Sequence, residues 1–372
     1  MPYWNTLMFE ALRIGSPSVL VTVISQSGST PRSAGARMIV LPDGSIRGTI
    51  GGGKFEGTAM TEAVSMLGQA GSTPVALAKI LFFSPESEDE VGLPCGGSLH
   101  VLLELVVDAP ALCDVYRAAA NAEKHGLPHA FVTELAPADW QGGSIKDLLS
   151  SARNQPGAAW QADRSIVLDE NTCIGAKPVP LALTQTALAL GEGETVLHEQ
   201  EGRVFLLESF PAPFTIHIFG GGHVAKALAD VLHPLGFHCI ILEDRPAFLT
   251  PERFPNARLH LLPDLGQETV AACLQAEPLT RRHGIIIMTR GHTQDRDVLA
   301  AALDAPAGYL GMIGSRKKGI EFKKTLLAAG ADPQKLDSVY TPIGLAIAAE
   351  TPEEIAISIA AELIAWKNAK PD

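Results

Sequence analysis

A glycine-rich loop in the second half of the chain has the residue types that hold a phosphate group. Gly220 and Gly222 follow an apolar stretch, and Ala225 completes a G-x-G-x-x-A pattern that opens a helical stretch. Glycines let backbone N–H groups approach a pyrophosphate, and a helix N-terminus favours negative charge. Glu243 and Asp244 lie about 20 positions further on. In dinucleotide-binding folds with this glycine pattern, an acid at that distance binds a ribose hydroxyl. The alternative is a fold of this kind that has lost its dinucleotide or holds another nucleotide-bearing cofactor. The predicted cofactor-binding residues are Gly220, Gly221, Gly222, His223 and Asp244.

A second glycine turn near the start of the chain separates a strand-like stretch from a helix-like one. Three consecutive glycines are costly to order, so Gly51, Gly52 and Gly53 indicate a special requirement of the backbone. Such a turn can offer several N–H groups to an anion, and Lys54 adds positive charge at the same place. The alternative is a tight turn that packs against a neighbour. The predicted cofactor-binding residues here are Gly51, Gly52, Gly53 and Lys54.

Two further N-terminal stretches carry reactive or anion-binding side chains. In GSTPRSAGARM (28–38), Arg32 and Arg37 are candidate donors to a phosphate or oxo-anion, and the alternative is a hairpin loop with solvated arginines. In LPCGG (93–97), Cys95 stands beside a proline and two glycines, where a ligand can approach closely. A thiolate is a soft metal ligand, so Cys95 is the candidate metal ligand, and the alternative is a small buried residue.

Polar residues also follow two later strand-like stretches. In a parallel sheet the carboxyl ends of the strands line the ligand crevice. His292, with Asp295 beside it, is predicted to orient a proton transfer or to bind a cofactor edge. The alternative is a cluster that caps a helix N-terminus. Ser315 and Arg316 in GSRKK are predicted to contact a phosphate.

The secondary structure that the sequence predicts around these residues changes near residue 210. From there on, Val- and Ile-rich stretches alternate with helical ones, which indicates a parallel sheet covered on both faces. The preceding part mixes strands with helices such as 54–69 and 111–126, an α+β pattern. Two prolines in 210–214 separate the two patterns. The sequence therefore predicts an α/β protein with an N-terminal α+β domain over 1–210 and a C-terminal Rossmann-like parallel sheet over 211–372.

Composition excludes several classes of partner. The formal net charge of -12 argues against nucleic acid and anionic membranes, because both require a positive field. No apolar run approaches the ~20 residues that span a bilayer, and the first residues do not resemble a signal peptide. The five cysteines show neither C-x-x-C nor zinc spacing, which favours reduced thiols. We expect a cytoplasmic protein.

Together these motifs resemble the XdhC/CoxI family, the xanthine dehydrogenase accessory factors. The resemblance covers both ends of the chain and skips most of 109–200. The stretches that carry it are SQSGSTPRSAGARMIV, GTIGGGKFE, LPCGGSLHVLLE, FGGGHVAKAL, LEDRPAF, MTRGHTQDRDVLAAAL, YLGMIGSRKK and PIGLAIAAETPEEIAISIAAELIA.

The resemblance implies a maturation role for molybdenum hydroxylases. A member of this family is expected to bind the molybdenum cofactor, as molybdopterin or its dinucleotide form, and to support its sulfuration with a cysteine desulfurase. It then delivers the cofactor to the apo-enzyme. This role implies a non-catalytic chaperone, a homodimer, and Cys95 as the ligand of molybdenum or the contact of its sulfur.

The competing interpretation is an NAD(P)-dependent oxidoreductase that uses the C-terminal domain. His292 is the only reasonable proton donor for that chemistry. This interpretation leaves Cys95 and the glycine triplet unexplained. NAD(P) is therefore the second candidate cofactor.

Overall fold

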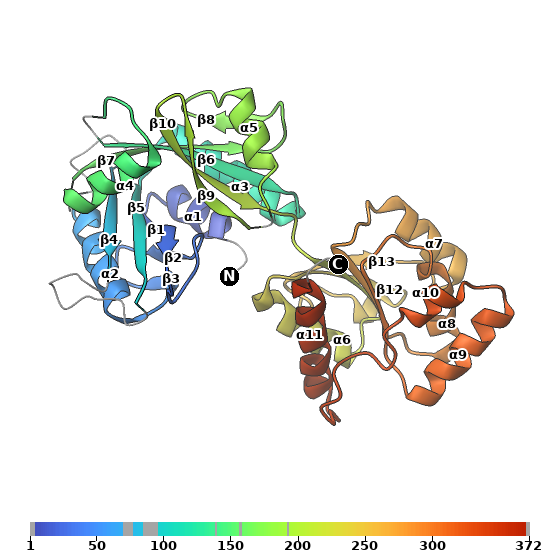
Figure 1. The fold of residues 1–372 in the computed structure, drawn as a ribbon. Helices are drawn as coiled ribbons and strands as arrows, with labels where there is room; N and C mark the ends of the chain where they lie inside the picture. Colours follow the sequence, from blue (N-terminus) through green and yellow to red (C-terminus); the bar gives the residue numbers. More distant parts are fainter. Residues whose placement is uncertain are drawn as a thin grey trace. The chain divides into compact units, whose positions relative to one another are not determined.

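The structure is a computed structural model that describes residues 4–69, 77–84, 96–137, 140–155, 158–191 and 193–369. The chain divides into two compact units between Ala212 and Pro213 (Figure 1). One unit holds an antiparallel sheet with helices, and the other holds a parallel sheet covered by helices. The predicted α/β fold class is confirmed.

The N-terminal unit is built on one bent antiparallel sheet in the order β3-β2-β1-β5-β4-β7-β6-β10-β9, with β8 paired to β7. Its bend brings strands that are distant in this order together, because Arg37 of β2 reaches Glu208 of β10. The strands are β1 (Ser18–Ser27), β2 (Arg37–Val40), β3 (Ile46–Gly48), β4 (Leu77–Phe83), β5 (Ser98–Val106), β6 (His129–Pro137), β7 (Trp160–Val167), β8 (Cys173–Gly175), β9 (Thr195–Gln200) and β10 (Arg203–Phe210).

Helices cover both faces of this sheet, so strand β1 is buried on both sides. On one face, α2 (Gly53–Leu67) packs on Val19, Val21 and Val23. On the other face, α1 (Trp4–Arg13) and α3 (Pro110–His125) pack on Leu20. Helices α4 (Ile145–Asn154) and α5 (Leu181–Leu188) close two further apolar clusters.

A layer of buried charges separates two apolar clusters inside the bent sheet. Arg164 pairs with Glu104 at 2.6 Å and with Glu208 at 3.0 Å, and Arg37 donates to Glu208 at 2.6 Å. Two guanidiniums and two carboxylates therefore balance each other away from water. The structure thus gives Arg37 a role inside the sheet in place of the predicted oxo-anion contact, since its side chain is only 9% exposed.

The C-terminal unit is a five-stranded parallel sheet in the order β13-β12-β11-β14-β15. Helices α6 and α11 lie side by side over one face, and α7, α8 and α9 cover the other (Figure 1). From β11 the chain continues to β12 and β13 on one side of β11, and then crosses to β14 and β15 on the other side. The direction in which strands are added therefore reverses between β11 and β14, which makes this the topological switch point of the sheet. The elements are β11 (Thr215–Phe219), α6 (His223–Leu232), β12 (His238–Glu243), β13 (Ala257–Leu261), α7 (Gln267–Ala276), β14 (His283–Ile287), α8 (His292–Ala302), β15 (Tyr309–Met312), α9 (Arg316–Ala328), α10 (Pro333–Asp337) and α11 (Pro352–Asn368).

A buried histidine in the central strand of this sheet makes its stability depend on pH. His217 is 1% exposed, and neither ring nitrogen has a hydrogen-bond partner among the described residues. Burial, with a smaller effect of the nearby His283, lowers the pKa of His217 to about 4. The unfolded chain therefore binds this proton more strongly, and stability falls as the pH drops from about 6.5 to about 4.

We expect His217→Leu to remove this part of the acid sensitivity. Between pH 7 and 4.5 the wild-type protein should lose about 2 kcal/mol more unfolding free energy than the variant. Denaturant titrations of both proteins across this range measure the difference. Equal pH profiles would show that the His217 ring is not the group that titrates.

Within the part of the chain that the structure describes, no helix has the length and apolar character that crossing a membrane requires.

Candidate functional site

The glycine loop between β11 and α6 combines two packed glycines with one open glycine. Gly220 has a φ of +113°, and a Cβ there would lie 2.4 Å from the Met288 carbonyl oxygen. A Cβ on Gly221 would lie 2.7 Å from the carbonyl oxygen of Phe248. Among the described residues, a Cβ on Gly222 would meet nothing within 4 Å, and no side chain caps the helix that starts after it. Gly222 is therefore the member of the loop that leaves the first amides of α6 accessible to an anion.

Glu243, at the end of β12, holds the glycine loop in place. Its carboxylate accepts hydrogen bonds from three backbone N–H groups, those of Gly221 (at 2.8 Å), Asp244 and Arg245. It also accepts two hydrogen bonds from the Arg245 guanidinium, each at 2.8 Å. The side chain is 1% exposed. Burial raises the pKa of this carboxyl, but the bonds from Arg245, Asp244 and Gly221 outweigh burial and lower it to about 2. Glu243 therefore stays ionised and stabilises the glycine loop through its hydrogen bond to Gly221.

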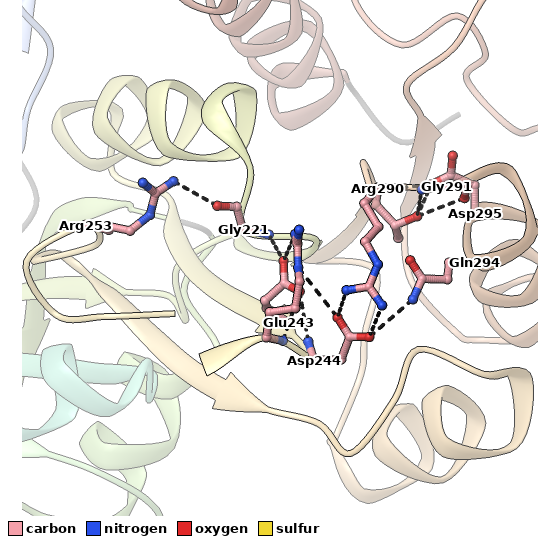
Figure 2. A network of polar contacts seen from close by, with 10 residues as sticks. Gly221, Glu243, Asp244, Arg253, Arg290, Gly291, Gln294 and Asp295 are labelled. Atoms are coloured by element: carbon pink, nitrogen blue, oxygen red, sulfur yellow. Dashed lines mark hydrogen bonds and ion pairs between the residues drawn. The ribbon is translucent and has the colours of Figure 1, made fainter. Parts of the chain in front are cut away.

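Asp244, the predicted cofactor-binding acid, is engaged by residues of the neighbouring loop after β14. Arg290 donates to its two carboxylate oxygens at 3.0 Å each, and the Gln294 amide donates at 3.2 Å (Figure 2). The sequence pattern did not single out Arg290 or Gln294. The signal was present, because both follow the carboxyl end of a parallel strand, as His292 does.

Guanidinium groups surround the glycine loop. Arg253 donates to the Gly221 carbonyl at 3.0 Å, and Arg245 lies 3.9 Å from the centre of the Phe248 ring. The buried Nε of Arg253 has no hydrogen-bond partner among the described residues. Arg245 pairs with Glu243 and Arg290 pairs with Asp244, whereas Arg253 binds the loop backbone, so three guanidiniums and two carboxylates lie at the loop. The loop therefore has a local excess of positive charge, which suits an anionic ligand.

His292 and Asp295 do not form the predicted proton-transfer pair. Asp295 is buried and accepts hydrogen bonds from the Thr289 backbone and hydroxyl, and from Lys318 at 2.5 Å. It closes the loop after β14 and ties it to the start of α9. His292 is the exposed first residue of α8, and its ring packs edge-on against Phe322.

The remaining predicted residues of this unit lie at helix starts. His223 is exposed at the first position of α6. Ser315 caps α9 by accepting the Lys318 N–H at 3.3 Å. Arg316 lines a pocket of about 350 Å³ with residues of α9 and α10, and no glycine-loop residue lines it. The structure thus brings His223, Asp244 and His292 to the edge of the sheet that carries the glycine loop, and gives Arg316 different surroundings.

In the N-terminal unit, the glycine triplet forms a turn that an internal carboxylate already occupies. Gly51, Gly52 and Gly53 all have positive φ, at 134°, 75° and 78°. The Glu56 carboxylate accepts the Gly52 N–H at 3.2 Å, and also the Ile50 N–H and the Thr49 hydroxyl. Burial raises the pKa of Glu56, but these bonds outweigh it and the pKa is lowered overall.

No side chain in the described part of the chain caps the first-turn amides of α2, and Lys54 is exposed beside them. Glu56 therefore occupies the Gly52 N–H of the predicted anion site, whereas the first-turn amides of α2 stay accessible to a ligand.

Three N-terminal motifs meet at one corner of this unit. A Cβ on Gly51 would lie 2.8 Å from the Pro31 Cβ, and one on Gly97 would lie 2.3 Å from the Ser29 carbonyl oxygen. Gly97 thus permits a close backbone approach. Cys95 lies outside the described residues. Among those that are described, no group of three or more His, Cys, Asp or Glu side chains is placed to hold a metal ion.

Comparisons with known proteins agree with this architecture. The model of the XdhC Rossmann domain matches residues 216–363, and the model of the XdhC and CoxI family matches residues 11–80. A crystal structure described as a xanthine dehydrogenase from Bacillus halodurans is 23% identical, covers 99% of this chain and 97% of that chain, and has a TM-score of 0.72. This similarity supports the fold.

Curated relatives match different shares of the chain. A Bacillus subtilis protein named as a probable subunit of xanthine dehydrogenase is 25% identical over 98% of this chain and 97% of its own length. The uncharacterized protein YqeB of Escherichia coli is 32% identical over 41% of this chain, but the match spans only 27% of YqeB. The molybdenum cofactor insertion chaperone PaoD of Escherichia coli is 31% identical over 32% of this chain and 36% of its own length.

Proposed function

The chain belongs to the XdhC and CoxI family, and we propose that it binds the molybdenum cofactor and serves in the maturation of a xanthine dehydrogenase-type molybdenum hydroxylase. In this proposal it supports sulfuration of the cofactor together with a cysteine desulfurase and inserts the cofactor into the apo-enzyme. It acts as a cytoplasmic homodimer and as a chaperone. The name of the relative PaoD, a molybdenum cofactor insertion chaperone, supports this direction.

The observation that carries the proposal is the glycine loop, with its open Gly222 at the start of α6. Molybdopterin ends in a phosphate, and its dinucleotide form contains a pyrophosphate. The open Gly222 and the first amides of α6, which no side chain of the described residues caps, suit such a group. Gly220, Gly221, Gly222 and His223 would hold it by backbone donors and local charge, with no catalytic step assigned to them.

The proposed residues of the N-terminal unit have a separate basis. Cys95 would bind molybdenum or contact its sulfur, because a thiolate is a soft ligand. Lys54 and the accessible amides at the start of α2 would contact an anionic group of the ligand.

Titration calorimetry of the pure protein with molybdenum cofactor, NAD(H) and NADP(H) tests the proposal. We expect binding of the molybdenum cofactor and none of the nicotinamide cofactors at micromolar protein. Binding of NAD(P)H alone would favour the oxidoreductase interpretation. Asp295 weakens that interpretation, because its bonds to Thr289 and Lys318 leave His292 without the expected partner.

We expect Cys95→Ser to weaken retention of sulfurated molybdenum cofactor by at least about 10-fold, since an oxygen ligand replaces a soft sulfur. The melting temperature should stay nearly unchanged. The matched control is Cys173→Ser, which makes the same substitution at an exposed cysteine of the same unit. A large drop in melting temperature with unaltered cofactor retention would show that Cys95 is only a packing residue.

A further inference from the structure

An ion pair bridges the sheet edge at which the glycine loop begins. Asp244 follows β12 and Arg290 follows β14, and β11, which leads into the loop, lies between these two strands. The bidentate contact between the two side chains therefore spans the carboxyl end of β11 (Figure 2). A ligand that reaches the loop at this edge meets the Arg290 guanidinium.

The two neighbouring acids differ in how easily they can exchange partners. Glu243 is 1% exposed and accepts hydrogen bonds from three backbone N–H groups and one guanidinium. Asp244 is 10% exposed and its partner Arg290 is 46% exposed. The half-exposed Arg290 can turn toward a ligand, and Asp244 would keep the Arg245 guanidinium 3.9 Å away as a positive neighbour. Arg245 cannot leave Glu243 without leaving a buried carboxylate unpaired.

The planar guanidinium of Arg290 is matched to a second kind of partner. The fork that binds two carboxylate oxygens binds two phosphate oxygens with the same geometry. Asp244 would not be left unsatisfied by the exchange, because Gln294 continues to donate to it at 3.2 Å.

We propose that Arg290 is the phosphate-binding side chain of this crevice, and that the Asp244 carboxylate is an internal placeholder that a phosphate or pyrophosphate group displaces. The inference rests on the proposed function only in requiring a phosphate-bearing ligand at the glycine loop. It changes the role of Asp244 from a direct cofactor contact to a competitor for Arg290.

The test measures binding of inorganic pyrophosphate by titration calorimetry to the full chain and its variants. Arg290→Gln should weaken binding by about 10-fold, because it removes a charge-assisted bidentate contact. Asp244→Asn should strengthen binding by about 3-fold, because it removes the competing anion. These opposite signs distinguish displacement from a structural tie, for which both substitutions would weaken binding. Arg290→Lys, which keeps the charge without the fork, should fall between wild type and Arg290→Gln.

The matched control is Asp230→Asn, which removes one negative charge from an ion pair with Lys226 on α6. Its pyrophosphate affinity should stay within about 2-fold of wild type, since exposed charges are screened. Tightening equal to that of Asp244→Asn would overturn the proposal in favour of a net-charge effect. Weaker binding in both Asp244→Asn and Arg290→Gln would also overturn it, as would no pyrophosphate binding by any of these proteins.

Failure of the inference and failure of the proposed function are separable. Opposite effects of the two substitutions on pyrophosphate binding, without binding of molybdenum cofactor, would support the placeholder and refute the proposed function. Binding of molybdenum cofactor with equal affinity by wild type and Arg290→Gln would refute the placeholder alone.

Discussion

Replacing Glu208 with Gln should lower the unfolding free energy of the N-terminal unit by about 3–5 kcal/mol, since it leaves buried charge without compensation. The Glu208 side chain is fully buried and contacts both Arg37 and Arg164. In the variant, Glu104 alone faces the two guanidiniums. Denaturant unfolding followed by tryptophan fluorescence, to which the buried Trp160 of this sheet contributes, measures the loss.

The control is Glu134→Gln in the same sheet. Glu134 also pairs with two basic residues, Arg203 and Lys177, but it is 20% exposed and its partners are about half exposed. Its loss should cost less than about 1 kcal/mol. An equal effect of both substitutions would contradict the view that burial makes the Glu208 network strong.

The charged layer is hard to predict from sequence because its members are far apart. Arg37 and Glu208 are separated by 171 positions. On β5, Glu104 stands between Leu102 and Val106, which belong to different apolar clusters. A single charge in an apolar strand indicates a buried partner, but only the bend of the sheet identifies that partner.

The parallel sheet was more predictable, because strands covered on both faces are apolar throughout. The stretches 215–219 and 238–244 stand out for that reason, and they correspond to β11 and β12. The pattern missed β13, Ala257–Leu261, an edge strand with half-exposed residues.

In the N-terminal unit the sequence analysis missed α4, although Ser144 and Asp147 form a capping box that marks its start.

At the candidate site, spacing located the acid but did not separate the roles of two adjacent acids. Glu243 and Asp244 are adjacent in sequence, but their contacts differ. The buried Glu243 accepts the Gly221 N–H of the glycine loop, whereas Asp244 pairs with Arg290. In the N-terminal turn, Glu56 belongs to the same motif as the glycines and fills part of the site predicted for a ligand. Glycine spacing thus finds anion-binding turns, but the occupant depends on side-chain contacts.

The largest functional effect is expected for Gly222→Asp. Gly222 has ordinary extended backbone angles, and a Cβ there would meet no described residue within 4 Å, so the substitution should not strain the fold. Asp is also a favoured N-cap, which should keep or slightly raise the melting temperature. Its carboxylate would accept the first amides of α6 and repel a phosphate. We expect pyrophosphate and molybdenum cofactor to bind about 10- to 100-fold more weakly by titration calorimetry.

Gly222→Asn separates charge from size, because the amide side chain has nearly the same shape and also caps a helix. Its affinity should lie between those of wild type and Gly222→Asp, and the gap between the two variants measures the repulsion alone. That gap should shrink as salt is added, since ions screen the repulsion between exposed charges. A folded Gly222→Asp protein that binds both ligands as tightly as wild type would remove the glycine loop from the binding site. Equal losses in both variants would instead show that the amides of α6, and not charge, determine the affinity.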